Sequence, residues 1–284
     1  MSPTIDRNSQ RKLSKPFRAR QHAIAGVPVH CLTIEEASTQ IVDVLRQRSA
    51  ATPFLIMGPN AQLITVAQRD FPLLAALHAS ALNVPDGISV VLASRILGRI
   101  VARVPGGELM EHLCRDSARC GLRVFFLGGL PEAAKLASQQ IQQRYPALQV
   151  AGAYCPPRGF EHDPMECAHI RQLITEAAPD LLFVALGVPK QEIWMHQNCS
   201  TLPIGAAMSV GAAFDTQSGL RLRAPRWTHS LGLEWLYRLV REPRRLWRRY
   251  LIGYPHFFYL VLRQRFLYGR SAARDSALPF RVPS

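Results

Sequence analysis

The sequence predicts an α/β fold: a Rossmann-like parallel sheet core followed by a helical, basic C-terminal appendage. From Val27 onward, short apolar runs alternate with longer amphipathic segments, which is typical of strand–helix repeats around a parallel sheet. The apolar runs end in turns that contain Gly or Pro. After Gly219 the composition shifts to Arg, Trp, Leu and Tyr, so we place the end of the core there.

Four apolar runs predict buried strands, at residues 54–57, 124–127, 181–186 and 204–210. Each leads into a turn with glycine, at residues 58–60, 128–129, 187–189 and 211. Helical spacing follows three of these turns, at residues 61–79, about 132–145 and 190–197. Because open α/β folds bind ligands at the carboxyl edge of the sheet, we expect the active site along these turns.

The chain is expected to divide into a loose basic tail (1–20), the α/β core (21–219) and the appendage (220–284). In the appendage, apolar residues recur at helical spacing, and Pro243 is expected to restart the helix. The apolar positions are Leu233, Leu236, Leu239, Val240, Leu246, Trp247, Tyr250 and Leu251.

The positive charge of the chain is concentrated at its ends. The formal net charge is +14, of which residues 1–20 carry +5. Residues 221–284 carry fourteen Arg against three acidic side chains, a net +11, and residues 21–220 carry −2. Such ends attract nucleic acid, anionic lipid or a phosphorylated substrate, so charge alone leaves the partner open.

Three of the four tryptophans, Trp227, Trp235 and Trp247, are interleaved with the arginines of the appendage. Amphipathic rings and guanidinium groups suit the headgroup region of a membrane, so we interpret the appendage as membrane-associating. A solvated basic helix face is the plainer alternative, and a nucleic-acid surface is less favoured because no nucleic-acid motif accompanies the charge. The sequence contains neither the roughly 18 apolar residues of a spanning helix nor a signal-peptide pattern.

Three turns offer groups that can do chemistry. Asp86 can act as a base for an attacking hydroxyl, or its carboxylate can cap the helix that follows. The Gly128-Gly129 turn can bring backbone N–H groups to a diphosphate, or serve packing alone. The segment 187–192 can hold phosphate and sugar groups, or be an ordinary helix start with an acid in its first turn.

Other chemistries find little support. The six cysteines form no CxxC pair, so we expect no metal and interpret them as reduced interior thiols of a cytoplasmic protein. The Gly-Gly turn lacks GxGxxG spacing, which argues against the first alternative function, an NAD-dependent sugar-nucleotide oxidoreductase or epimerase. The second alternative is a basic nucleic-acid-binding module.

Several motifs occur together in the order typical of one enzyme family. They are Gly58-Pro59-Asn60-Ala61, Pro85-Asp86-Gly87, Arg103-Val104-Pro105-Gly106 with Glu108-Leu109-Met110, residues 124–131, 187–192 and 211–219, and Arg223-Ala224-Pro225-Arg226-Trp227. Residues 231–238 and 242–250 add a matching C-terminal segment. Over residues 27–262 the chain resembles the WecG/TagA/CpsF glycosyltransferases (glycosyltransferase family 26).

The resemblance implies an inverting, metal-independent glycosyltransferase that uses a UDP-sugar donor, an undecaprenyl-diphosphate-linked acceptor and no cofactor. The sugar is of the N-acetylmannosamine, N-acetylmannosaminuronic acid or glucuronic acid type, for a cell-surface polysaccharide or exopolysaccharide. The expected location is the inner face of the cytoplasmic membrane, bound peripherally to its anionic surface. Nucleic acid is not an expected partner, and a homo-oligomer stays open.

The resemblance also implies roles for individual residues. Asp86 matches the catalytic base, Asn60 and Gln191 match positions lining the donor pocket, and the Gly128-Gly129 turn would place the nucleotide. The appendage arginines that neutralise the leaving diphosphate match Arg238, Arg245 and Arg248.

The chain departs from the family pattern at three positions. Gly58 stands where many members have Thr, and Pro105 and Glu108 stand where Thr and Asp are common. The departures leave the choice among the three sugars open.

Overall fold

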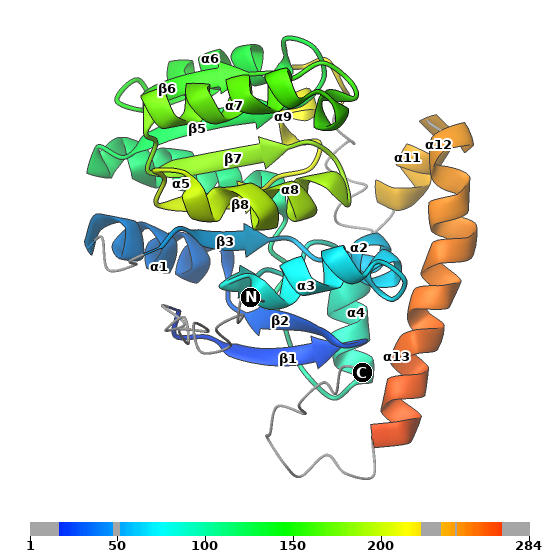
Figure 1. Ribbon diagram of the computed structural model, residues 1–284. Helices are drawn as coiled ribbons and strands as arrows, with labels where there is room; N and C mark the ends of the chain where they lie inside the picture. The colour runs from blue at the N-terminus through cyan, green and yellow to red at the C-terminus, as the bar shows by residue number, and fades with distance from the viewer. Residues whose placement is uncertain (1–16, 48–51, 223–233, 242, 269–284) are drawn as a thin grey trace, which may run out of the picture.

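The computed structural model describes residues 17–47, 52–222, 234–241 and 243–268. Its centre is a six-stranded parallel sheet in the order β4-β3-β8-β7-β5-β6 (Figure 1). The strands are β3 (Phe54–Met57), β4 (Leu82–Asn83), β5 (Arg123–Gly128), β6 (Gln149–Tyr154), β7 (Leu181–Ala185) and β8 (Ala206–Ser209). The Rossmann-like α/β core is therefore confirmed, and β4 and β6 join the four strands that the sequence predicts.

Helices cover both faces of the sheet because its side chains alternate between two apolar layers. In β3, Phe54 and Ile56 pack on one face, and Leu55 and Met57 pack on the other. The first face is covered by α1 (Ile34–Gln47), α5 (Gly106–Cys120), α6 (Ala133–Arg144) and α9 (Ala213–Gln217). The second face is covered by α2 (Ala61–Ala67), α3 (Phe71–Ala79), α7 (Pro164–Ala177) and α8 (Lys190–Asn198).

The connections that leave β3 and β8 go to opposite faces of the sheet. These strands are neighbours, but β3 leads into α2 and β8 leads into α9. A divergence of this kind opens a crevice at the carboxyl ends of the two strands. In Figure 1 the arrows of β3 and β7 point toward the side of the molecule where α11, α12 and α13 lie.

The segment 61–79, expected to be one helical stretch, forms two helices. Helix α2 ends at Ala67, and α3 begins again at Phe71. The Asp70 side chain caps the new helix by accepting a hydrogen bond from the Leu73 N–H at 3.0 Å. A capping aspartate followed by proline in the first turn is a strong helix-start signal, and it explains the break.

A hairpin that the sequence did not indicate precedes the sheet. Strands β1 (Arg20–Ile24) and β2 (Val27–Cys31) pair antiparallel. Phe17 is buried and packs edge-on against Phe54, with ring centroids 5.2 Å apart. The expected tail of residues 1–20 is therefore wrong for residues 17–20, because an apolar ring enters the core; residues 1–16 lie outside the described residues.

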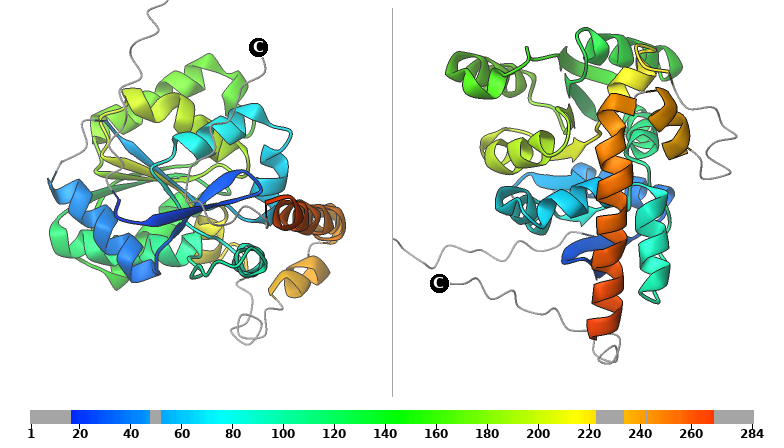
Figure 2. Two further views of the ribbon diagram at one scale, coloured as in Figure 1. Left: turned by 90° about the horizontal axis from the view of Figure 1, so that it is seen from below. Right: turned by 90° about the vertical axis from the view of Figure 1, so that its right-hand side faces the viewer.

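The C-terminal helices are α11 (Glu234–Arg241), α12 (Pro243–Arg248), the π-helical turn η3 (Arg249–Gly253) and α13 (Tyr254–Tyr268). The predicted helix restart at Pro243 is confirmed. Both views of Figure 2 show α13 running alongside α2 and α4 (Ile88–Ile96). Among the described helices, none combines the length and apolar character needed to cross a membrane.

Helix α13 is joined to the core by apolar and polar contacts. Phe257 and Val261 are fully buried in the same apolar layer as α2. The Gln264 side chain bonds the hairpin turn, accepting from the Ala25 N–H at 2.7 Å and donating to the Ala23 carbonyl at 2.9 Å. The appendage therefore supplies part of the core; its expected start at residue 220 stays a prediction, since residues 223–233 lie outside the described residues.

All six cysteines are free thiols, but only Cys114 and Cys199 are buried, so the expected interior position holds for these two alone. Burial raises the pKa of Cys199 to about 12, and it also raises the pKa of Cys114. These two thiols are therefore poor nucleophiles at neutral pH.

Replacing Phe257 with alanine should destabilise the whole protein, because it leaves a cavity between α13 and the core. We expect a loss of about 3–5 kcal/mol in the free energy of unfolding, measured by urea denaturation. The matched control is Tyr259→Ala on the same helix, where the side chain is 59% exposed. Equal effects of the two substitutions would contradict the packing of α13 on the core.

Candidate active site

Asp86 lies beyond β4, against the turn that ends β3. The Asp86 N–H donates to the Pro59 carbonyl at 3.2 Å, and the Val84 N–H donates to the Met57 carbonyl at 2.8 Å. A Cβ added to Gly58 would lie 3.2 Å from the Asp86 Cβ, so a side chain there would require Asp86 to move by a few tenths of an ångström. The glycine that replaces the common threonine therefore permits this close approach of the two turns.

The Asp86 carboxylate lies at the start of α5. Its Oδ1 accepts a long hydrogen bond, 3.4 Å, from the N–H of Gly106, the first residue of this 15-residue helix. The positive end of a helix favours a negative charge at this place. The alternative role, a cap for the helix that follows, is wrong, because Gly87 is the N-cap of α4 and no side chain caps it. Asp86 is half-buried and so can be reached from solvent.

Asn60 lies beside the turn that carries Asp86. Its Cβ is 3.8 Å from the position that a Cβ on Gly87 would occupy. Its Oδ1 caps α2 by accepting from the Leu63 N–H at 3.0 Å. The side-chain nitrogen has no hydrogen-bond partner among the described residues, so it is a donor that a ligand can use.

The Gly128-Gly129 turn ends β5, and sterics require both glycines. A Cβ on Gly128 would lie 2.6 Å from the Ala185 carbonyl oxygen, and one on Gly129 would lie 2.8 Å from the Ala133 Cβ. The Gly129 N–H donates to the Ala185 carbonyl at 2.8 Å, and the Leu130 N–H donates to Asp215 at 2.9 Å. A diphosphate at this turn would have to use other donors; the nucleotide-placing role stays a prediction.

Gln191 links the first turn of α8 to the loop after β8. Its Oε1 accepts from the Gly211 N–H at 3.2 Å, and its Nε2 donates to Glu192 at 2.6 Å. The end of β8, from which this loop leaves, lies close to the start of α5, since a Cβ on Gly106 would lie 3.7 Å from the Ser209 carbonyl oxygen. Gln191 is 3% exposed, so in this conformation it braces the site more than it lines a surface.

For Glu192 the sequence predicts only an acid in the first turn of a helix. It is 1% exposed, which is unusual for a glutamate in the first turn of a helix. Burial, the largest cause, and the nearby Asp86 charge raise its pKa to about 7, although hydrogen bonds from Gln191, its own backbone N–H and Ser209 oppose the shift. No local signal marks this burial: Glu192 stands three residues after the turn at 187–189, a first-turn position that predicts an exposed side chain.

The cations predicted near the site are only partly described. Lys190 forms an ion pair with Glu161 and lies over the Phe160 ring, 5.7 Å from its centroid. The backbone of the three appendage arginines belongs to α11 and α12, but their side chains lie outside what the structure describes: Arg238, Arg245 and Arg248. Their role therefore stays a prediction.

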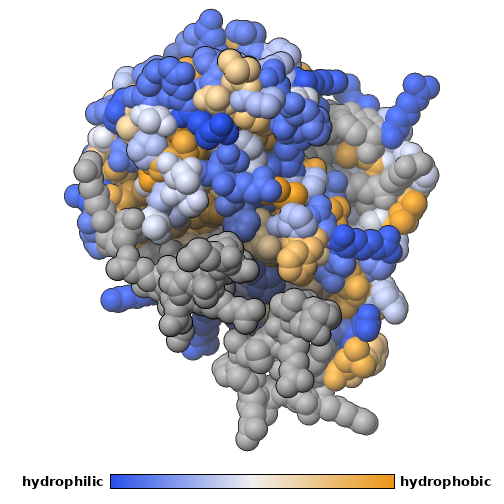
Figure 3. All heavy atoms as spheres, in the orientation of Figure 1, coloured by the Kyte–Doolittle hydropathy of each residue, from blue (hydrophilic) through white to orange (hydrophobic). Residues whose placement is uncertain are grey.

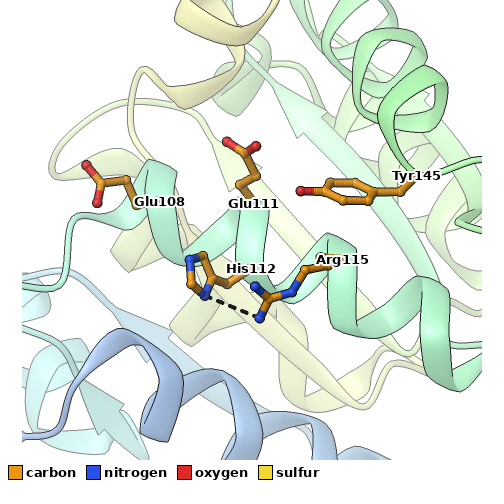
Figure 4. A pocket seen from close by; sticks show the side chains of 5 residues that line it. All are labelled: Glu108, Glu111, His112, Arg115 and Tyr145. Atoms are coloured by element: carbon orange, nitrogen blue, oxygen red, sulfur yellow. Dashed lines mark hydrogen bonds between the residues drawn. The ribbon is translucent and has the colours of Figure 1, made fainter. Parts of the chain in front are cut away.

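A pocket of about 250 Å³ lies along α5, and Asp86 is not among its lining residues. Figure 4 shows its side chains, with His112 and Arg115 turned toward each other. The lining residues are Glu108, Glu111, His112, Arg115 and Tyr145. Its charges are paired within the protein: Glu111 bonds Arg144 and Gln217, and Arg115 bonds Asp116.

The structure thus brings together some of the predicted site residues and separates others. Asp86 and Asn60 lie side by side, and Gln191 reaches them through the loop after β8 and the start of α5. Gly128 and Gly129 lie farther along the same edge, at the end of β5, which is separated from β3 by β8 and β7. No group of three or more metal-ligating side chains occurs within the described parts of the chain.

Comparisons with known proteins identify the kind of enzyme. Residues 22–271 match the Glycosyl transferase WecG/TagA/CpsF family. The chain is 32% identical over 211 residues to the N-acetylglucosaminyldiphosphoundecaprenol N-acetyl-beta-D-mannosaminyltransferase of Bacillus subtilis (strain 168). The aligned residues cover 74% of this chain and 79% of the relative. A protein of the same name from Staphylococcus aureus (strain MW2) is 28% identical over 243 residues, covering 85% and 92%.

The family match spans most of the chain, including the motifs around Asp86 and Gln191. This match agrees with the parallel sheet and with the polar turns at its carboxyl edge. The chain belongs to the WecG/TagA/CpsF glycosyl transferase family and is a glycosyltransferase.

Proposed function

We propose that this enzyme transfers an N-acetylmannosamine-type sugar from UDP to the saccharide of an undecaprenyl-diphosphate-linked acceptor. The names of the two relatives indicate the acceptor and the sugar. Both relatives are mannosaminyltransferases that act on N-acetylglucosaminyldiphosphoundecaprenol. The structural observation that supports the proposal is the Asp86 carboxylate, half-buried at the start of α5 and beside the β3 turn.

In this reaction Asp86 acts as the general base. An ionised carboxylate has about four acceptor sites, so it can accept the bond from Gly106 together with a further interaction and still take a proton. As the acceptor hydroxyl attacks C1 of the sugar, its proton passes to Asp86, the new C1–O bond forms, and the bond from C1 to the diphosphate breaks. Asn60 offers its side-chain nitrogen to the substrate from the same turn.

The linkage in the relatives' names supports inversion as part of the proposed reaction. Those names specify a β-linked product. If the donor is an α-linked sugar nucleotide, a β product requires attack from the face opposite UDP, and a single base meets that need. The departing diphosphate also needs positive charge, and without a metal the appendage arginines would provide it, since guanidinium groups bind phosphate in a fixed fork.

The appendage supplies a surface for the membrane that holds the acceptor. Helix α13 has two apolar faces: Phe257 and Val261 face the core, whereas other apolar side chains at helical spacing face solvent. On α13 the solvent-facing set is Tyr259, Leu262 and Phe266, and Ile252 is exposed in the turn η3 that precedes the helix. Figure 3 shows hydrophobic atoms among hydrophilic ones along the side where α11–α13 lie.

An apolar helix face that no described residue covers, on a segment with a net charge of +11, fits an anionic bilayer. Arg263 and Arg265 are exposed on the same helix, where they can meet lipid phosphates. We therefore propose peripheral binding to the inner face of the cytoplasmic membrane.

The proposed reaction is tested directly by measuring UDP release from a set of UDP-sugars, with a short-chain N-acetylglucosaminyl lipid diphosphate as acceptor. We expect turnover with UDP-N-acetylmannosamine, and equal rates with and without EDTA. Preference for a uronic acid donor would replace the proposed sugar, loss of activity in EDTA would overturn the metal-free mechanism, and no transfer from any UDP-sugar would overturn the function.

Replacing Asp86 with asparagine should lower kcat by about 10²–10⁴-fold, because the amide cannot take the proton. The amide oxygen can still accept from Gly106, so UDP binding measured by calorimetry should be retained. The control is Asp70→Asn, which preserves the α3 cap and should stay within twofold of the wild type. Near-normal turnover of the Asp86 variant would remove this residue from the mechanism.

The membrane proposal predicts that charge on the exposed apolar side chains of η3 and α13 weakens lipid binding. The double substitution Ile252→Glu and Phe266→Glu should lower the partition coefficient on anionic vesicles by at least about tenfold in a sedimentation assay, since two apolar anchors are lost. The control is Met165→Glu on α7, where an apolar side chain is 80% exposed. If the control loses binding equally, or the double variant loses none, α13 is not the membrane surface.

A further inference from the structure

Glu192 is a buried carboxyl group to which the proposed reaction assigns no role. It is the third residue of α8, and its side chain is 1% exposed. Oε1 accepts the hydrogen bond from Gln191 at 2.6 Å. Oε2 is buried and has no hydrogen-bond partner among the described residues. A buried carboxylate oxygen without a partner is costly, so the group needs either a ligand or a proton.

The surroundings of Glu192 favour the proton. Strands β3 and β7 and helix α3 line the same layer with apolar side chains, among them Met57, Val184 and Leu73. On α3, the titratable side chain at the end of the helix, His78, is exposed. On α8, the Lys190 cation is engaged by Glu161. No described cation therefore balances a negative charge on Glu192.

The charged group that acts on Glu192 from another element is Asp86. Burial, the larger cause, and the Asp86 carboxylate together raise the pKa of Glu192 to about 7. The Gln191 amide, the Glu192 backbone N–H and the Ser209 hydroxyl favour ionisation but do not outweigh these two causes. Asp86 itself is half-buried and lies at the positive end of α5. The two environments thus push the carboxyls toward opposite protonation states.

We propose that Glu192 carries a proton in the working enzyme, so that Asp86 is the ionised member of this pair of carboxyls. The inference rests on the proposed function, in which Asp86 is the base. A proton on Oε2 turns the unpartnered oxygen into a hydroxyl, while Oε1 continues to orient the Gln191 amide. It also removes a second negative charge from a site that must receive a diphosphate. Glu192 is therefore a positioning residue.

The decisive variant is Glu192→Gln, because glutamine mimics the protonated acid at every pH. Its oxygen can accept from Gln191, and its nitrogen replaces the hydroxyl. The quantity to measure is the ratio of kcat/KM of the variant to that of the wild type between pH 6 and 9, in which the titration of the substrates cancels. We expect this ratio to rise about tenfold by pH 8 and about a hundredfold by pH 9, because only the wild type ionises. The control is Glu176→Gln, an exposed carboxyl on α7, whose ratio should stay flat.

Stability provides a second readout that does not depend on activity. The folded pKa of Glu192 is raised above the ordinary value of about 4.5, so the folded protein binds more protons than the unfolded chain between about pH 4.5 and 7. The contribution of Glu192 to stability therefore falls as pH rises through this window and is level above it. The melting temperature of Glu192→Gln, relative to that of the wild type, should be higher at pH 8 than at pH 5.

The possible outcomes separate this inference from the proposed function. If the wild type transfers no sugar at any pH, the proposed function fails. If transfer occurs but the activity ratio stays flat from pH 6 to 9, the inference on Glu192 is overturned. Should the variant not fold, ¹³C NMR of glutamate carboxyls in the wild type decides: a glutamate that titrates near pH 7 supports the proposal, and none above about pH 6 contradicts it.

Discussion

Both faces of the central strands must be buried, and the rest of the structure depends on this requirement. In β3, Phe54 and Ile56 need cover on one side, and Leu55 and Met57 need cover on the other. Helices therefore pack on both faces, and every strand runs in the same direction, because each connection crosses from the end of one strand to the start of the next. The turns that carry polar groups consequently lie along one edge of the sheet.

That edge places a carboxylate where a helix begins. The chain leaving β4 passes Asp86 on its way to α4, and the following helix, α5, starts at Gly106 beside it. The close contact with Gly58 holds the Asp86 turn against the end of β3. The proposed base must be ionised and accessible near neutral pH, and a half-buried position at the positive end of a helix favours both. Glu192, enclosed by apolar strands and without a cation, has the opposite environment.

Helix α13 has a place both in the core and in the proposed membrane contact. It completes the apolar layer over α2 through Phe257 and Val261, and it leaves a second apolar face uncovered. A soluble helix normally has a polar outer face, so the outward Tyr259 and Phe266 carry a cost that a partner must offset. In an enzyme whose proposed acceptor is anchored in lipid, the same helix can hold the core and dock on the bilayer.

The sequence by itself determined the fold class, the strand-ending turns and the family motifs, because strand and helix periods and glycine turns are local properties. It also determined Asp86 as a candidate base, since a motif marks its position. Tertiary structure alone decided that Phe17 is buried, that α13 belongs to the core and that Asp86 contacts α5 and does not cap α4. It alone singled out Glu192, whose first-turn position predicts exposure. Burial and electrostatic environment arise from segments distant in the chain, so no local pattern can specify them.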